Sequence, residues 1–106
     1  MTVFTPDLLA NGQVASSEGA IYTCPASTRA MIKTVTFVNT SATPQTVVFY
    51  IRESAGTSRR VFQWIMSQYQ TGVYGESIAL NAGDTLRAVS TTNNVVDFTV
   101  HGVEQV

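Results

Sequence analysis

The sequence predicts an all-β domain, an antiparallel β-sandwich (jelly-roll-like or immunoglobulin-like) of seven to eight strands with an N-terminal arm. The 106 residues include 15 Thr and 14 Val but a single Lys, and β-branched residues favour pleated strands. Short apolar runs alternate with turn residues at spacings near the roughly 8–12 residues typical of sandwiches and barrels. Charged residues make up only 12% of the chain, so the side chains that coat exposed helices are scarce.

The chain is long enough for one domain, which we divide into an arm over residues 1–19 and a sandwich over residues 20–106. The arm contains TPDLLANG (residues 5–12), in which a Thr cap, a Pro at the first helical position and a late Gly predict one or two helical turns. Its apolar residues are Phe4, Leu8 and Leu9. The arm is expected either to cover one end of the core or to dock on a neighbouring subunit.

Seven strands are predicted by alternation between breaker-rich turns. They cover residues 20–24, 29–39, 46–53, 59–67, 77–80, 85–90 and 95–104. The first strand ends at Pro25, which cannot donate to a ladder. The segment 67–77 is polar, aromatic and too long for a tight hairpin, and we interpret it as a loop.

The alternation also assigns the core. We expect Ile32, Val35 and Phe37 to lie in the core. Three later strands each carry an apolar face, formed by Val47, Phe49 and Ile51, by Leu86 and Ala88, and by Val96, Phe98 and Val100. The odd spacing from Ile32 to Val35 predicts a β-bulge near Lys33 and Thr34. Residues 46–53 are partly apolar on both faces, which predicts a strand that is covered on both sides.

No catalytic constellation is visible, and we predict no catalytic, cofactor-binding or metal-binding residues and no enzyme activity. A Ser–His–acid triad needs a His, and the single one, His101, falls on an outward position of the last strand. One His and one Cys are too few for a zinc site. Cys24 is expected to be a small buried hydrophobe, and Asp84 in NAGD (residues 81–84) is expected to serve as a turn residue.

The charge and hydropathy of the chain argue against two classes of partner. The net charge is −1 and the pI about 5.6, so binding to nucleic acid is not expected. The one basic pair, Arg59 and Arg60, is interpreted as a solvated strand start. No apolar run approaches the roughly 20 residues of a membrane helix, and the first residues lack the pattern of a secretory signal.

Three aromatic residues stand out as interface candidates. Trp64, Tyr69 and Tyr74 lie in and beside the predicted loop 67–77, and Trp and Tyr are enriched at binding hot spots. One alternative is a sugar-binding platform. Another is a purely structural role, with Trp64 in the core and the tyrosines covering one end of the domain.

The sequence resembles a group of small β-sandwich virion proteins of tailed bacteriophages. The resemblance rests on AIYTCPASTRAMIKTVTFVNTS (residues 20–41), TVVFYIRES (46–54) and IALNAGDTLRAVSTTNNVVDFTVHGVEQV (78–106). Members of the group are head decoration (cement) proteins, head-fibre bases and tail-fibre or baseplate modules. Residues 1–19 fall outside the pattern.

The resemblance implies a structural role on the virion. We expect a capsid decoration protein on the outer surface of a phage head, a homotrimer that binds the major capsid protein and stabilises the shell across subunit joints. The arm, with Phe4, Leu8 and Leu9, would reach a neighbouring capsomer, and either one face of the sandwich or the loop 67–77 would form the trimer contact. The alternative is a tail, baseplate or head-fibre module that binds a partner protein or a host surface glycan.

Overall fold

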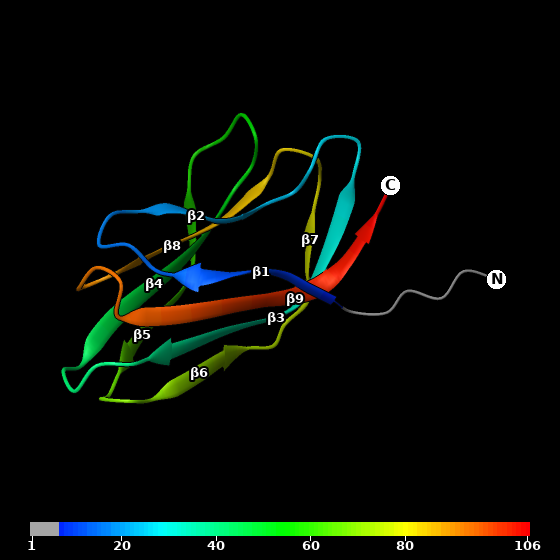
Figure 1. Cartoon of the computed structure of the whole chain (residues 1–106). Helices are drawn as coiled ribbons and strands as arrows, with labels where there is room; N and C mark the ends of the chain where they lie inside the picture. Colours follow the sequence, from blue (N-terminus) through cyan, green and yellow to red (C-terminus); the bar gives the residue numbers. More distant parts are fainter. Residues whose placement is uncertain (1–6) are drawn as a thin grey trace.

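The computed structural model describes residues 7–106, which form nine strands in two antiparallel sheets (Figure 1). The strands are β1 (Asp7–Gln13), β2 (Gly19–Thr23), β3 (Arg29–Asn39), β4 (Gln45–Arg52), β5 (Arg59–Met66), β6 (Thr71–Tyr74), β7 (Ile78–Leu80), β8 (Thr85–Ser90) and β9 (Val96–Gln105). One sheet, here called the first, has the order β1-β9-β3-β6, with β7 also paired to β3; the second has the order β2-β8-β4-β5. The fold is the β-sandwich that the sequence predicts.

The strand order identifies the sandwich as a jelly roll. The chain crosses from one sheet to the other at every connection except β4–β5 and β6–β7. Because β6 and β7 both pair with β3, they share one strand position. Each sheet therefore has four positions, the arrangement of a double-sheet jelly roll.

The seven predicted strands are all present. The bounds of β3 and β8 match the prediction, and the other five differ by at most one residue at either end. The predicted β-bulge is confirmed at Lys33, since Ile32 pairs with Gly102 while Thr34 already pairs with His101.

The prediction of helical turns near the N-terminus is wrong over the described part. Residues 7–13 of the predicted arm form β1, which pairs antiparallel with β9. A helix of one or two turns gains little by itself, whereas β1 gains a ladder on β9, interrupted by a bulge at Leu9, and packs Leu9 and Ala10 against the core. Gly12 does not end a helix but leaves room for the ring of Phe98 opposite it, whose Cε1 would lie 3.2 Å from an added Cβ.

The interpretation of residues 67–77 as a loop is also wrong in part. Residues 71–74 form β6, paired with β3 from Val35 to Val38. The turn before it is short, because Gln70 N donates to Ser67 O over 3.1 Å. A four-residue strand with a central glycine gives too little alternation to be distinguished from a loop.

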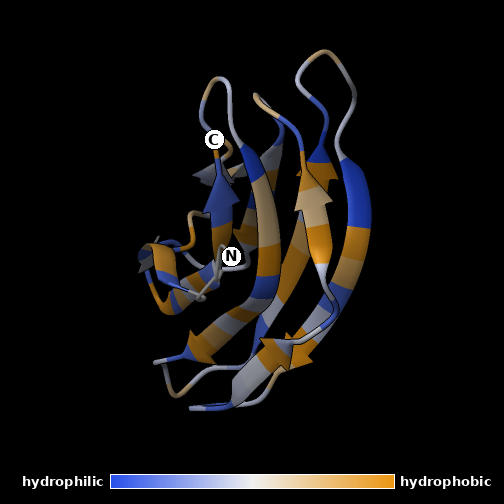
Figure 2. Cartoon of the chain, turned by 90° about the vertical axis from the view of Figure 1, so that its right-hand side faces the viewer, coloured by the Kyte–Doolittle hydropathy of each residue, from blue (hydrophilic) through white to orange (hydrophobic). Residues whose placement is uncertain are grey.

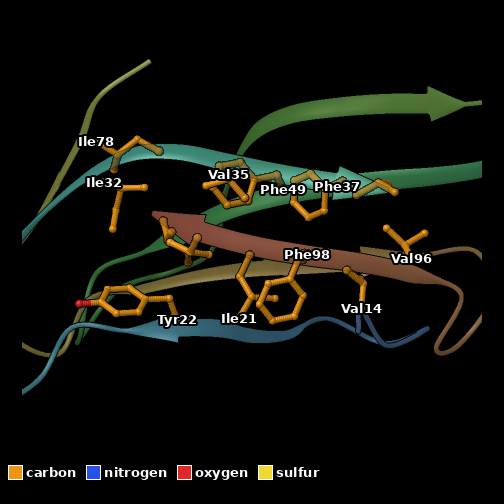
Figure 3. Close-up of a cluster of buried hydrophobic side chains, with 14 of the residues drawn as sticks. Val14, Ile21, Tyr22, Ile32, Val35, Phe37, Phe49, Ile78, Val96 and Phe98 are labelled. Atoms are coloured by element: carbon orange, nitrogen blue, oxygen red, sulfur yellow. The ribbon is translucent and has the colours of Figure 1, made fainter. Parts of the chain in front are cut away.

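The core lies between the two sheets and contains the three predicted core residues, Ile32, Val35 and Phe37. Figure 3 shows side chains of the two sheets pointing toward one another, among them Val35, Phe37 and Phe49, which are all fully buried. The apolar faces predicted for β4, β8 and β9 also point into the core, where Ile51 is half-buried and the other residues of these faces are buried. Hydrophobic and hydrophilic residues alternate along the long strands (Figure 2), as expected for sheets with one face in the core.

The two sheets meet at the side formed by β5 and β6. Trp64 of β5 lies across Gly72 of β6 so closely that a Cβ on Gly72 would be 1.8 Å from Trp64 Cζ3. Only glycine leaves this space. The contact fixes the edge of the second sheet against the edge of the first.

A polar contact ties the sheets together at another point. Tyr22 of β2 is buried, and its Oη donates to Glu104 Oε2 of β9 over 2.5 Å. Burial and the neighbouring Glu104 carboxylate raise the pKa of Tyr22. The hydrogen bond therefore depends on a protonated tyrosine.

Replacing Gly72 is expected to destabilise the sandwich. Gly72→Ala forces the Trp64 ring to move, at a cost of about 1–3 kcal/mol in the free energy of unfolding. The control is Gly75→Ala, where an added Cβ meets nothing within 4 Å; its effect is expected within ~0.5 kcal/mol. Urea denaturation of both variants measures the difference, and equal stabilities would contradict the contact.

Stability is expected to fall at alkaline pH. Because folding raises the pKa of Tyr22, its contribution is complete below the unfolded-state pKa of about 10 and is lost as the pH rises above that value. Tyr22→Phe should lower the free energy of unfolding by about 1 kcal/mol at neutral pH. It should also reduce the loss of stability that the wild-type protein shows above pH ~10. Tyr69→Phe, at an exposed position, is the control and should leave the free energy of unfolding at neutral pH within ~0.5 kcal/mol of the wild-type value.

Candidate interaction surfaces

Three exposed apolar side chains lie along the side where β5 and β6 meet. Ile65 is 71% exposed, Tyr69 64% and Val73 54%. They come from β5, the β5–β6 turn and β6, within nine consecutive residues. Because Trp64 and Gly72 meet between the sheets, the next residues, Ile65 and Val73, point outward from the second and the first sheet respectively. We call these three residues the side surface. Their apolar surface is available for burial on another molecule, so we treat these three residues as candidate contact residues.

An aromatic cluster inside the sandwich supports the side surface. The ring centroids of Phe62 and Trp64 are 5.0 Å apart, and those of Phe62 and Tyr74 are 5.7 Å apart. Phe49 continues the cluster, 5.6 Å from Tyr74. All these pairs are edge-to-face, a favourable geometry for aromatic rings. Trp64 and Tyr74 are therefore half-buried in packing within the protomer.

The turn that carries Tyr69 is fixed by Asn39, which is fully buried at the end of β3. Asn39 Nδ2 donates to Thr43 O over 2.9 Å and to Ser67 O over 3.1 Å. Its Oδ1 accepts from the backbone N and the hydroxyl of Ser41. One side chain thus joins the β3–β4 loop to the β5–β6 turn.

Tyr69 itself has a backbone conformation that non-glycine residues rarely adopt. Its φ is 56°, and its backbone N donates to Ser41 O over 3.2 Å. Such strained positions persist only where the surrounding structure determines them. An exposed aromatic ring on a fixed turn loses little entropy on binding, which is typical of a contact residue.

A second candidate surface is a groove of about 460 Å³ on the outer face of the first sheet. Met31, Ala79 and Val103 are directly opposed across β7, β3 and β9, and they contribute apolar surface to it. Polar and charged side chains of Arg29, Lys33, Asn81 and Gln105 also line it. We call this feature the sheet groove.

The remaining interface candidates are divided between surface and core. Leu8 is 51% exposed and lies opposite His101 in the ladder of β1 and β9. Leu9 is half-buried and packs against the core. Phe4 lies outside the described residues.

The side chains that could take part in catalysis or metal binding do not form a common site among the described residues. Cys24 is buried as predicted, with its Sγ 3.3 Å from Thr28 O, and burial raises the pKa of its thiol. Asp84 is confirmed as a turn residue, accepting from Asn81 N over 2.9 Å and from Ser54 N over 3.1 Å. Within residues 7–106, no three His, Cys, Asp or Glu side chains group as metal ligands.

Arg87 and Glu18 form an ion pair at the protein surface. Arg87 Nε lies 2.7 Å from Glu18 Oε2, which also accepts from Ser58 Oγ. These hydrogen bonds, that of Ser58 first, lower the pKa of Glu18. Arg59 and Arg60 are exposed, as predicted. None of the described segments is a helix of the length and apolarity needed to cross a membrane.

Sequence reasoning missed Asn39, Gly72, Ile65 and Val73 as determinants of this region. Ile65 could have been found, because the same face of its strand carries the polar Gln63 and therefore points to solvent. Gly72 and Val73 required recognition of β6. Nothing in the local pattern distinguishes Asn39 from an ordinary turn residue.

No family model matches the chain, and no curated protein matches it in sequence. Among solved structures, the chain is similar to a protein of Bacillus endospore appendages, described as a novel family of disulfide-linked pili, with a TM-score of 0.52. The two are 17% identical, and the match covers 95% of this chain and 86% of the other. This likeness supports the assignment of the fold.

Removing the Asn39 side chain is expected to loosen the turn that carries Tyr69. Asn39→Ala removes the hydrogen-bond donor to the carbonyl oxygens of Thr43 and Ser67. It should lower the free energy of unfolding by about 2 kcal/mol or more. Amide exchange at Ser41 and Tyr69 should accelerate with it. The exposed Asn93→Ala, whose Oδ1 accepts only from Ser16 N, is the control. Similar losses from both variants would refute the role given to Asn39.

Proposed function

We propose that this protein is a structural subunit that works by contact with other proteins, and specifically a capsid decoration (cement) protein of a tailed bacteriophage. In this proposal it sits on the outer surface of the head as a homotrimer and binds the major capsid protein across subunit joints. The tail, baseplate or head-fibre module that binds a partner protein or a glycan is the alternative.

The side surface is the observation that carries the proposal. Ile65, Tyr69 and Val73 are each more than half exposed, and burying them on a partner would recover roughly 25 cal/mol per Å² of apolar surface. The Asn39 network and the Trp64–Gly72 contact hold their backbone in place. A pre-organised apolar surface favours a lasting protein contact.

The fold and the resemblance to phage virion proteins point in the same direction. Jelly rolls recur in viral capsid and lectin domains. The similar protein of Bacillus endospore appendages is described as part of disulfide-linked pili. That linkage does not suit this chain, because Cys24 is its single cysteine and is buried. We therefore propose assembly through non-covalent contacts.

A homotrimer suits a surface that lies on one side of the subunit. In a cyclic trimer each interface is heterologous, so the side surface of one copy contacts a different region of the next. Three copies then close a ring without leaving an open end. A ring also offers three equivalent contacts to a shell position with three-fold symmetry.

The glycan alternative has less support than the protein contact. Stacking on sugar rings needs exposed aromatic faces, but Trp64 lies over Gly72 and Tyr74 packs on Phe49 and Phe62. Tyr69 remains as the exposed aromatic of the three. A platform of three rings is therefore not formed.

Polar replacement of the side surface is expected to abolish association. The double variant Ile65→Ser, Tyr69→Ser should lower the fraction of trimer in sedimentation velocity at least tenfold, and should reduce co-sedimentation with heads of the phage that encodes the chain. The control is Gln63→Ser, on the same face of β5. A wild-type protein that stays monomeric and does not bind heads would rule out the proposal. Glycan-array binding lost in Tyr69→Ser would favour the alternative.

A further inference from the structure

Two open strand edges lie next to each other at the side of the sandwich that carries the side surface. β5 is the last strand of the second sheet, β6 occupies the last position of the first, and Trp64 lies across Gly72 between them. Among residues 7–106, no strand pairs with the outer edge of either one. β1, the first described strand, is at the opposite edge of the first sheet (Figure 1).

The edge of β6 presents the backbone groups of two residues. Asn39 N donates to Gln70 O over 2.9 Å, so the carbonyl group of Gln70 faces β3. Successive residues of an antiparallel ladder direct their backbone groups to opposite sides. Thr71 and Val73 therefore point their N–H and C=O groups away from β3, toward the open edge. Both residues are uncharged and exposed.

The same reasoning identifies two residues at the edge of β5. Thr46 O accepts a hydrogen bond of 3.2 Å from the backbone N of the residue that follows β8, so Thr46 faces β8. The next residue, Val47, then faces β5, where it is opposite Trp64. Trp64 thus directs its backbone groups to β4, whereas Gln63 and Ile65 on either side direct theirs to the open edge.

These edges lack the features that usually prevent one strand from pairing with another. Proteins protect open edges with charged side chains, proline or β-bulges. In β5 the exposed Arg59 and Arg60 and the bulge at Val61 protect the start of the strand, but residues 62–66 have none of the three. β6 has no charge, no proline and no bulge. Both edges are therefore templates for a further strand.

We propose that β5 of each copy pairs antiparallel with β6 of the next copy, with Gln63 opposite Val73 and Ile65 opposite Thr71. This inference rests on the proposed function, since it names the contact that closes the trimer. In this register both open residues of each edge find a partner. A shift by two residues would leave one residue of each edge without a partner.

The charges at the ends of the two strands agree with this pairing. The register that places Gln63 opposite Val73 brings Arg60, just before the bulge, beside Glu76, just past the end of β6. Both Arg60 and Glu76 are exposed. Parallel pairing would bring Arg60 to the uncharged start of β6. Pairing of β5 with another β5 would give it no acid either, because residues 61–75 contain no Asp or Glu.

A three-fold axis along the strands leads to the same register independently. Trp64 and Gly72, which contact each other, are each four residues from Gln68 in the turn, so β5 and β6 run in opposite directions and these residues are level. A closed rotation involves no shift along its axis. Residues that are level within one copy are therefore opposite each other between copies, which again places Gln63 opposite Val73.

The pairing also buries part of the side surface. Residues directly opposite each other in a ladder share a face, and diagonal neighbours on that face are within reach of one another. Ile65 of one copy is then a diagonal neighbour of Val73 of the next, because both point outward from their sheets. The β5 part of one side surface thus meets the β6 part of another, and no copy of the ring is left with an open edge on this side.

Cysteine crosslinking between two different variants tests the pairing. Gln63→Cys and Val73→Cys are co-expressed as separate chains in the Cys24→Ala background and treated with the short thiol crosslinker dibromobimane, in solution and on heads of the phage that encodes the chain. We expect a fluorescent product of dimer mass, at least fivefold above that from either variant alone. The control combines Val73→Cys with Asn93→Cys, an exposed position in the β8–β9 turn, and should give no product above background.

The outcomes separate this inference from the proposed function. A product from Gln63→Cys alone would show that β5 pairs with β5 and would overturn the inference. Trimers in sedimentation velocity that give no mixed product would overturn it as well, but would leave the proposed function standing. A chain that stays monomeric and does not bind heads would rule out both.

Charge reversal tests the register without cysteines. Arg60→Glu and Glu76→Arg should each weaken the trimer roughly fivefold in sedimentation equilibrium, and the two changes combined should restore its affinity to within about twofold. The matched control, Arg59→Glu combined with Glu76→Arg, should show no recovery. A recovery confined to the free energy of unfolding in urea would place the pair within one copy, and either that result or no recovery would overturn the inference.

Discussion

The close approach of Trp64 to Gly72 is the contact on which the arrangement of this molecule depends. It joins β5 of one sheet to β6 of the other, so that the chain can cross between sheets through a turn of only a few residues. The aromatic cluster of Phe49, Phe62 and Tyr74 fills the space behind it. As a consequence, Ile65 and Val73, which follow Trp64 and Gly72 in sequence, are held on the outer faces of the two sheets along this side, where both are more than half exposed. Packing inside the protomer thereby creates the surface that we propose for assembly.

The strands that could be predicted are those with enough alternation to reveal two faces. Residues 29–39 and 85–90 have breakers at both ends and apolar residues on one face, and the structure has the same bounds. The bulge at Lys33 followed from a single odd spacing. The elements that were missed depend on distant partners. Local signals at residues 5–12 favour a helix, but the edge of β9 is available only in the folded sheet. Likewise, β6 needs a glycine at Gly72 because the Trp64 ring, eight residues earlier in the sequence, occupies the space that a side chain would fill.

For the interface candidates too, residue type could be read from the sequence, whereas exposure depends on contacts between distant segments. Aromatic residue type alone could not separate Tyr69, which is 64% exposed, from Trp64 and Tyr74, which are half-buried. The difference arises because alternate residues of β5 and β6 point to opposite faces of their sheets, and because Asn39 fixes the turn that carries Tyr69. The sheet groove could not be predicted from the sequence either, because Met31, Ala79 and Val103 meet only when β3, β7 and β9 pair. A structural role that depends on surface shape is harder to predict than one that depends on a motif of reactive groups.

The central claim is that assembly buries the side surface. The most direct measurement is hydrogen–deuterium exchange of the isolated protein and of the protein in its native particle, compared peptide by peptide. The account predicts that protection increases over residues 63–74, including the exposed turn at Tyr69, while β2 changes little. Unchanged exchange over residues 63–74, with new protection confined to β2 and β8, would contradict it.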